Sequence, residues 1–328
     1  MPGYEQNDLN PFQSLVVHFL SLKDREDFQR FVLKEKARTN TNKTMKWTIY
    51  PTQGYKKWTD KNALPSKVEP NKYPIYVISK GRWENPLTIK QLNHLGIEYR
   101  LVIEPQELKK YLSSPHVNSD KILTLPTKNF GGGCSIPARN WCWEHSIKSG
   151  APFHWILDDN IQGFFELNHN RKPKIRDYNP FRVVEHFVDQ FQNIGISGMN
   201  YEFFVQRRNA HPAYVENTRV YSCILIRNDL PFRWRGRYNE DTDLSLRVLK
   251  SGLCTVLFNY VLAKKVVTMT MKGGNTDSLY KLKDKDGRLE MAKALCELHP
   301  DVSKIVHKWG RWQHHVDYSG FHQRLKWK

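Results

Sequence analysis

The sequence predicts an α/β fold in which a mainly parallel sheet is flanked by helices and preceded by a small α+β appendage. Two observations predict it. From residue 73 onward, short apolar runs typical of buried strands alternate with amphipathic stretches of helical length, which is the pattern of βαβ units. The hydrophobic fraction of 39% in 328 residues is large enough to build the core that such a sheet requires.

The first half of this pattern is regular. Strands are expected at four places, namely 73–81, 98–105, 120–126 and 153–159. Helices are expected between them, at 85–96, 106–114 and 135–150. The last of these helices has Pro137 in its first turn and Gly150 at its end, which are the residue types favoured at those positions.

The second half of the pattern is less regular. Helices are expected at 181–195, 239–253 and 289–300, and a strand at 221–228. A basic and aromatic tail follows Pro300. Upstream of the sheet, residues 1–52 have the pattern of a small α+β module, and the Lys-, Asn- and Pro-rich stretch 53–72 reads as a linker. The main domain is therefore expected to span 73–328.

The composition limits the class of protein. A formal net charge of +18 indicates a polyanionic partner, most often nucleic acid, although a basic surface that only confers solubility remains an alternative. The five cysteines form no CxxC pair, which argues against a disulfide framework and a zinc ribbon. The longest apolar run, 253–263, is too short to span a bilayer, and no signal peptide is evident. We expect a cytoplasmic protein without a membrane partner.

Two adjacent carboxylates end the strand in "HWILDDN". Asp158 and Asp159 lie where an open parallel sheet binds its ligands, at the carboxyl end of a strand. A divalent cation makes such a pair tolerable, and oxygen ligands suit Mg²⁺ or Mn²⁺, which usually bridge a protein carboxylate to a diphosphate. The sequence therefore indicates a nucleotide site. A helix N-cap or an Asx-turn at the strand exit is the competing interpretation.

Other strand ends and helix starts carry residues suited to the same ligand. Lys80 and Arg82 follow the first strand in "SKGR", and Glu104 ends the second. Three glycines in "NFGGGCSIPARN" precede a helix, where a backbone can approach an anion closely. Acidic residues open the helix in "RYNEDTDLS", where favourable pairing with the helix dipole is the competing interpretation.

The motifs "VISKGR", "ILDDN" and "NED" occur in the order found in GT-A glycosyltransferases. Together with "GGGCSIPARNWCWEHS", "RYNEDTDLSLR" and "KGGN", they resemble the TET-associated glycosyltransferases of tailed phages, over about residues 73–275. The resemblance implies a GT-A, Rossmann-like sheet and the transfer of a sugar to 5-hydroxymethylcytosine in phage DNA. The N-terminal segment resembles a short module of phage DNA-modification proteins.

The resemblance assigns roles around a UDP-sugar donor and a Mn²⁺ or Mg²⁺ ion. Asp159 would be the main metal ligand, and Asp158 would contact the ribose or the donor sugar as well as the metal. Asn160 stands where many relatives carry a further Asp, so it would bind through its carbonyl oxygen or not at all. The remaining nucleotide-binding residues by resemblance are Ser79, Arg82, Glu104 and Arg139, to which the place of Lys80 after the first strand adds a further candidate.

The resemblance also places the reacting groups. Asp241 would be the general base of an inverting transfer, and Glu240 would contact sugar hydroxyls; for a retaining transfer, Asp241 need not be the base. Lys272 stands where many GT-A enzymes have a metal-binding His, and it would neutralise the diphosphate. His314 or His315 of the tail is an alternative metal ligand, with a solvated basic patch as the competing interpretation.

A DNA acceptor would account for the basic charge of the chain. Candidate contacts are Arg207 and Arg208 in one loop, and Trp309, Arg311 and Trp312 in the tail. The tryptophans could instead cover the sheet. The implied setting is the cytoplasm of an infected host, with a functional link to a phage cytosine-hydroxymethylating enzyme. A protein or polysaccharide acceptor and a non-catalytic DNA-binding GT-A module remain alternatives.

Overall fold

The computed structural model describes residues 69–328, except 134, 169–170, 207–208, 210 and 267–285. The expected N-terminal module at 1–52, and the expected linker up to residue 68, therefore lie outside the described residues. No helix within the described ranges is both long enough and apolar enough to cross a membrane.

The first half of the domain has the regular alternation that the sequence predicts. Its strands are β1 (Ile75–Ile78), β2 (Arg100–Ile103), β3 (Ile122–Thr124) and β4 (Phe153–Asp158). Its helices are α2 (Leu87–His94), α3 (Leu108–Leu112) and α4 (Ser135–Lys148). Each expected strand and helix of this half is present, with ends that differ by a few residues.

The second half contains more strands than the sequence analysis anticipated. Its helices are α5 (Pro180–Val188), α6 (Glu240–Lys250) and α8 (Gly287–Leu298). Its strands are β5 (Ile161–Glu166), β6 (Ile194–Tyr201), β7 (Tyr214–Glu216), β8 (Cys223–Arg227), β9 (Cys254–Lys265), β10 (Ser303–Lys308) and β11 (Arg311–Val316). The helix expected at 181–195 ends at Val188, because Ile194 already begins β6.

Strands β1 to β9 form one large sheet in the order β3-β2-β1-β4-β8-β6-β9-β5, with β7 also paired to β9. The first four strands are parallel, as expected. Beyond β4 the sheet is mixed, since β8 runs antiparallel to both β4 and β6, and β5 antiparallel to β9. The turn between β4 and β5 is too short to hold a crossover helix, so the chain reverses direction there.

Alternate residues of the central strands pack on opposite faces of the sheet. Val77, Trp155 and Leu157 belong to the core cluster that includes α2 and α5. Tyr76 and Ile156 belong to the cluster that includes α4 and α6. Both faces are thus covered, which explains why these strands read as continuous apolar runs in the sequence.

The pairing of β1 with β4 marks the point at which the strand order reverses. From β1 the chain moves outward to β2 and β3, and then returns to place β4 on the other side of β1. Ile78 at the end of β1 lies in register with Asp158 at the end of β4. The loops that leave these two strands therefore diverge and open the crevice in which α/β sheets bind ligands.

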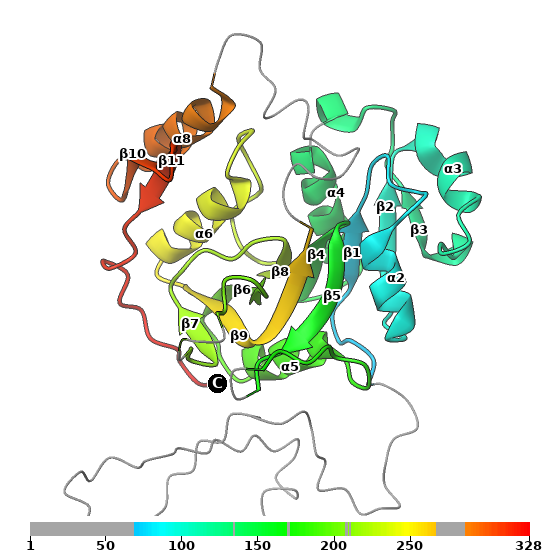
Figure 1. Ribbon diagram of the computed structural model, residues 1–328, viewed down its shortest axis with the longest axis horizontal. Coiled ribbons are helices and arrows are strands. Elements are labelled where there is room, and N and C mark those ends of the chain that lie inside the picture. Colours follow the sequence, from blue (N-terminus) through cyan, green and yellow to red (C-terminus); the bar gives the residue numbers. More distant parts are fainter. Residues whose placement is uncertain (1–68, 134, 169–170, 207–208, 210, 267–285) are drawn as a thin grey trace, which may run out of the picture. The chain divides into compact units, whose positions relative to one another are not determined.

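The basic and aromatic tail contains a hairpin. β10 and β11 form a separate two-stranded sheet, joined at Trp309 and Gly310, which have φ values of 53° and 70°. Two positive φ values are typical of a type I′ hairpin turn. Val316 packs with Leu295 of α8 and Leu246 of α6, so the hairpin lies beside the helix that opens with Glu240 (Figure 1).

His154 provides a test of how the core of β4 is packed. Its ring is fully buried, its Nδ1 lies 2.5 Å from Asn228 Oδ1, and burial lowers its pKa to about 3. Between pH 6.5 and about 3, His154 is therefore neutral in the folded protein but protonated in the unfolded chain. We expect the free energy of unfolding to fall by up to about 1.4 kcal/mol per pH unit from pH 6.5 towards 3 on this account.

Urea unfolding of the wild type and of His154→Gln at pH 7, 6, 5 and 4 measures this contribution. The variant lacks the titrating ring, so its stability should decline less steeply than that of the wild type over this range. Parallel declines of the two proteins would contradict a neutral, buried His154.

Candidate active site

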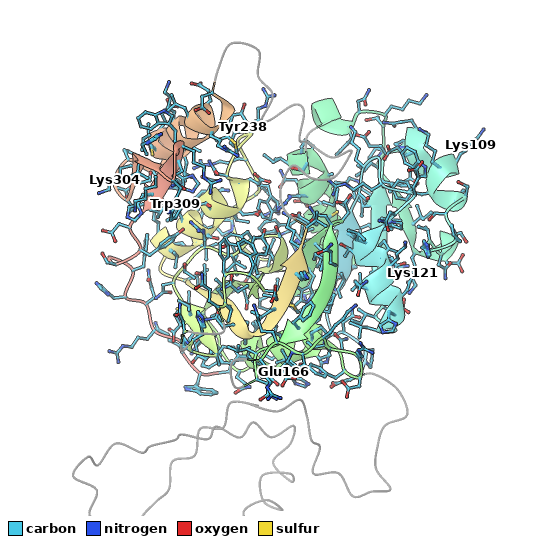
Figure 2. The ribbon with its side chains drawn as sticks, viewed as in Figure 1. Lys109, Lys121, Glu166, Tyr238, Lys304 and Trp309 are labelled. Carbon is cyan, nitrogen blue, oxygen red and sulfur yellow. The ribbon has the colours of Figure 1, made fainter. Side chains whose placement is uncertain are left out.

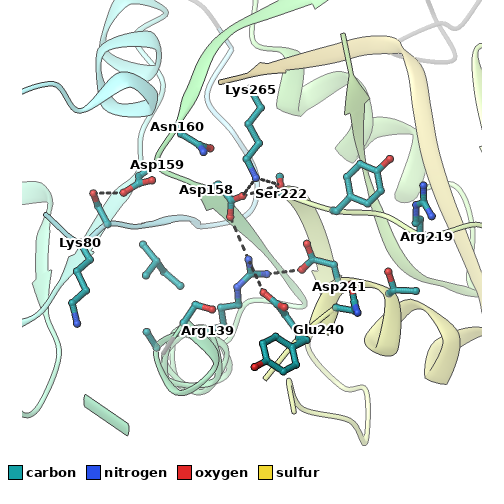
Figure 3. Close-up of a pocket in the computed structure, with 18 of the residues that line it drawn as sticks. Lys80, Arg139, Asp158, Asp159, Asn160, Arg219, Ser222, Glu240, Asp241 and Lys265 are labelled. Carbon is teal, nitrogen blue, oxygen red and sulfur yellow. Dashed lines mark hydrogen bonds and ion pairs between the residues drawn. The ribbon is translucent and has the colours of Figure 1, made fainter. Parts of the chain in front are cut away.

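A cavity of about 630 Å³ opens at the carboxyl ends of β1, β2 and β4 and beside the start of α6 (Figure 3). Its lining contains ten of the residues that the sequence analysis assigned to the nucleotide, the metal or the reacting groups. These are Ser79, Lys80, Arg82, Glu104, Arg139, Asp158, Asp159, Asn160, Glu240 and Asp241. Residues up to 162 positions apart in the chain thus meet in one pocket.

Asp158 is held by cations on two sides. Its Oδ1 accepts a hydrogen bond from Arg139 at 3.2 Å, and its Oδ2 accepts from Lys265 at 2.6 Å and from Ser222 at 2.8 Å. Burial alone would raise the pKa of Asp158, but Lys265 and Arg139 lower it to about 2. Asp158 is therefore a permanent anion at neutral pH.

Asp159 is bound by the loop that follows β1. Its Oδ2 accepts a hydrogen bond from Ser79 Oγ at 2.7 Å, and its Oδ1 forms an ion pair with Arg82. Ser79 Oγ also lies 2.6 Å from the hydroxyl of Tyr111. Burial raises the pKa of Asp159 above its ordinary value, although Arg82 opposes the shift. The side chain is thus fixed at the junction of the two strand ends.

Arg139 connects the two acidic parts of the pocket. Its Nη1 donates to Asp241 Oδ1 at 2.7 Å, and its Nη2 lies 3.2 Å from Asp158 Oδ1 and 3.7 Å from Glu240 Oε1 (Figure 3). The guanidinium also lies over the ring of Trp234, with Cζ 4.6 Å from its centroid. The three carboxylates raise the pKa of this buried guanidinium, so it stays charged.

The acidic residues that open α6 divide between two environments. Burial raises the pKa of Asp241 to about 7, against the opposing effect of Arg139, and the charges of Glu240 and Asp158 add to the increase. Asp243 points elsewhere and pairs with Arg247 and with His299, at 2.9 Å in each case. Asp241 and Glu240 therefore serve the pocket, whereas Asp243 anchors the helix.

Two of the three glycines before α4 allow a tight turn of the backbone. Gly131 and Gly132 have φ values of 59° and 80°, and a Cβ on Gly131 would lie 2.2 Å from Cγ of Pro137. A turn of this kind requires glycine. It directs the chain into α4, which carries Arg139 into the pocket.

At the far end of the cavity, Lys80 and Glu104 form an ion pair of 3.1 Å. Glu107 accepts hydrogen bonds from the backbone N–H of Gly81 at 2.9 and 3.0 Å, and this fixes the loop after β1. The pair thus presents an ammonium and a carboxylate side by side, at the ends of β1 and β2.

The side chains at the β4 end present oxygen atoms, the kind of ligand that Mg²⁺ and Mn²⁺ prefer. Asn160 Oδ1 is buried and has no hydrogen-bond partner, and it lies beside the carboxylates of Asp158 and Asp159. No group of three or more His, Cys, Asp or Glu side chains placed to hold a metal occurs in the part of the chain that the structure describes. The remaining ligands of a cation here would come from substrate and water, as is usual for Mg²⁺.

The pocket also contains residues that the sequence analysis did not assign. Lys265, at the end of β9, binds Asp158, and the lining further includes Arg219, Tyr221 and Ser222. In the sequence, Lys265 could have been recognised from its place just after the long apolar run 253–263. His314 of β11 lines the pocket as well, and burial lowers its pKa to about 4, so it is neutral. His315 is exposed.

The remaining predicted residues lie elsewhere. Arg207, Arg208 and Lys272 fall outside the described residues. The three residues of the tail lie on the β10–β11 hairpin: Trp309, Arg311 and Trp312. Trp309 is 82% exposed and Trp312 40% exposed, so the alternative in which the tryptophans cover the sheet is wrong for Trp309.

The fold and the pocket define a Rossmann-like α/β protein with a charged pocket at its switch point. The family described as TET-Associated Glycosyltransferase matches residues 73–274, more than half of the chain. The chain belongs to this family and is thus a glycosyltransferase.

Other comparisons add little. Among solved structures, the inositol-1-phosphate CTP transferase from T. maritima is similar at 8% identity, with a TM-score of 0.34, over 68% of this chain and 96% of that chain. No argument rests on so low a likeness. No curated protein matches the sequence.

Arg139→Met tests whether the bridging guanidinium holds the pocket together. The substitution leaves the carboxylates of Asp158 and Asp241 buried without their shared partner, which should lower the free energy of unfolding by about 3–5 kcal/mol. Lys293→Met, which removes an exposed helical pair with Glu290, should cost less than about 1 kcal/mol.

The double variant Arg139→Met/Asp241→Asn separates charge from packing. Because the amide removes one unpaired charge, the second substitution should restore part of the lost stability in urea unfolding. Strictly additive effects of the two substitutions would show that the guanidinium and Asp241 are not coupled.

Proposed function

We propose that the protein transfers a sugar from a UDP-sugar to the hydroxyl of 5-hydroxymethylcytosine in DNA, with Mn²⁺ or Mg²⁺ as cofactor. The observation that carries the proposal is the pair of ion contacts of Arg139, which join Asp158 at the end of β4 to Asp241 at the start of α6. One pocket thereby holds a corner suited to a nucleotide diphosphate and a carboxylate suited to accept a proton.

The charge of the pocket supports a bound cation. Among the described residues of the lining, five carboxylates face five basic side chains. The carboxylates are Glu104, Asp158, Asp159, Glu240 and Asp241, and the basic residues are Lys80, Arg82, Arg139, Arg219 and Lys265. A diphosphate would leave this balanced pocket with excess negative charge. A divalent cation held by Asp158, Asp159 and Asn160 would offset the charge that develops on departing UDP.

The ends of β1 and β2 would hold the nucleoside. Ser79 and Arg82 line the pocket beside Asp159, and Glu104 and Lys80 lie at its far end. A carboxylate that accepts hydrogen bonds and an ammonium that donates them, placed together, suit the edge of a nucleobase or the ribose hydroxyls. Arg139 and Lys265 would attract the diphosphate between this end and Asp241.

Asp241 is the group in the pocket best suited to activate the acceptor. With a pKa near 7, its carboxylate can take a proton at neutral pH, as a general base must. In an inverting transfer, the acceptor oxygen bonds to the anomeric carbon, the bond from that carbon to the UDP oxygen breaks, and the acceptor proton passes to Asp241. Glu240, next to it, would bind sugar hydroxyls.

A DNA acceptor fits the charge of the chain, which has a formal net charge of +18. The exposed hairpin offers Trp309, Arg311 and Trp312 for stacking and phosphate contacts, and Arg207 and Arg208 are further candidates. The family name supports a partner that oxidises or hydroxymethylates the base first. We place the reaction in the cytoplasm of an infected host cell.

Donor and acceptor are identified by one experiment. The protein is incubated with DNA that contains 5-hydroxymethylcytosine, with a panel of UDP-sugars and Mn²⁺, and the nucleosides are analysed by mass spectrometry. We expect the mass of one sugar on 5-hydroxymethylcytosine and none on cytosine. EDTA and the Asp159→Ala variant should each abolish the product, because the diphosphate charge is then not offset.

Two results would contradict the proposal. Transfer to a glycan or protein in the absence of DNA would exclude the acceptor. An undiminished yield with EDTA would exclude the role of the metal.

The pH dependence of kcat tests Asp241. The base must have lost its proton, so kcat should rise about tenfold per pH unit below pH 7 and level off above it. Asp241→Asn should lower kcat by roughly 10²- to 10⁴-fold, with the KM for the donor little changed. Glu240→Gln is the matched control and should keep the rising limb. If Asp241→Asn retains kcat, another group takes the proton.

A further inference from the structure

Two adjacent aromatic rings stand exposed at the mouth of the pocket. Phe203 and Phe204 lie in the turn after β6, and they are 59% and 44% exposed. Their ring centroids lie 4.1 Å apart. Single exposed apolar side chains are common, but adjacent exposed rings that form one patch are typical of a binding surface.

The position of the two rings is fixed by the loop that carries them. Phe204 donates its backbone N–H to the carbonyl of Tyr201 at 3.1 Å, and the next residue, Val205, is fully buried. Lys172 Nζ donates to the carbonyl of Glu202 at 2.6 Å and pairs with its carboxylate. The rings thus project from an anchored turn.

The rings continue inward as an aromatic stack. The ring of Tyr201 lies nearly parallel to that of Phe203, at 16° and 5.7 Å, and packs against Tyr221 at 4.6 Å. Phe204, Tyr201 and Tyr221 line the cavity that contains Asp241. Burial raises the pKa values of both tyrosines, and the charge of Asp241 adds to the increase.

A basic side chain accompanies the stack. Arg219 lies with its guanidinium carbon 5.4 Å from the centroid of Tyr221, and it also lines the cavity. Figure 3 shows Arg219 on the side of the pocket opposite Lys80, away from the β1 and β2 ends. An anionic group of an acceptor would meet Arg219 at this side.

We propose that Phe203 and Phe204 form a stacking platform for the acceptor nucleobase, which leaves the base stack of DNA to present its hydroxymethyl group to Asp241. This inference rests on the proposed function and adds the acceptor subsite to it. Arg219 binds the phosphate next to the turned-out nucleotide. A ligand that stacks a planar ring on the two phenylalanines and offers an anion to Arg219 is a nucleotide. A neutral polysaccharide fits less well, because it would leave Arg219 without a partner of opposite charge.

Leucine substitutions distinguish the contribution of ring stacking to DNA binding from that of an apolar surface alone. Phe203→Leu/Phe204→Leu keeps apolar side chains of similar size but removes both rings. The KM for 5-hydroxymethylcytosine DNA should rise on the order of 5- to 150-fold, as expected for the loss of base stacking. The affinity for UDP, measured by calorimetry, should stay within about twofold. Phe203→Tyr/Phe204→Tyr should retain most of the wild-type KM.

Two further variants complete the test. Trp327→Leu removes an exposed ring that does not line the cavity, and the KM for DNA should not change. Arg219→Gln should reduce the slope of log K against log salt by about one, whereas the leucine variant should keep that slope. When 5-hydroxymethyl-dCMP is the acceptor, the KM of the leucine variant should again be higher than that of the wild type.

The results that overturn the inference differ from those that overturn the proposed function. If wild-type protein glycosylates 5-hydroxymethylcytosine DNA and the leucine variant does so with the same KM, the rings bind no base. If the leucine variant raises the KM for a glycan acceptor instead, the platform binds sugars and the inference is wrong. If the wild type itself gives no product on this DNA, the proposed function has failed.

Discussion

The ion contacts of Arg139 are the constraint on which the pocket depends. A guanidinium in a site this poorly hydrated is tolerable only when carboxylates surround it, and the same carboxylates are tolerable only when it is present. The residues concerned come from α4, from the end of β4 and from the start of α6. Their mutual neutralisation therefore fixes one helix from each half of the domain against the central strand.

The pairing of acidic with basic side chains also explains why the acidic residues of α6 have different roles. Asp241 and Asp243 are two positions apart, about 200° around a helix, so they face opposite ways. Asp243 meets Arg247 and His299 and ties the helix to its surroundings. Asp241 meets a single guanidinium within a group of acids, and its pKa is raised to about 7. One short acidic run thus supplies both an anchor and the carboxylate that we propose as the general base.

The two halves of the sheet contribute different surfaces to one cavity. The parallel half supplies polar and charged side chains at the ends of β1, β2 and β4, in the setting where α/β proteins bind nucleotides. The mixed half supplies Lys265 and the aromatic side chains of Tyr201 and Tyr221. In Figure 2, the labelled Lys109 and Lys121 lie on the side of the domain that carries α3, whereas Lys304 and Trp309 lie on the hairpin at the other side. Under the proposed function, the parallel half would form the donor side of the cavity and the mixed half the acceptor side.

The sequence by itself determined the parallel half of the sheet, its helices, and the arrival of Asp158 and Asp159 at a strand end, because alternation and helical period are local properties of the chain. It also placed Asp241 at a helix start, and with the family resemblance it brought ten residues of the pocket into one prediction. It missed β5, β6, β7, β9 and the hairpin, whose identity as strands depends on partners distant in the chain. Only the tertiary structure decided that Lys265 binds Asp158 across 107 positions and that Arg139 binds Asp241 across 102. Such contacts leave no periodic trace in a sequence, since charge compensation depends on distance in space and not on spacing along the chain.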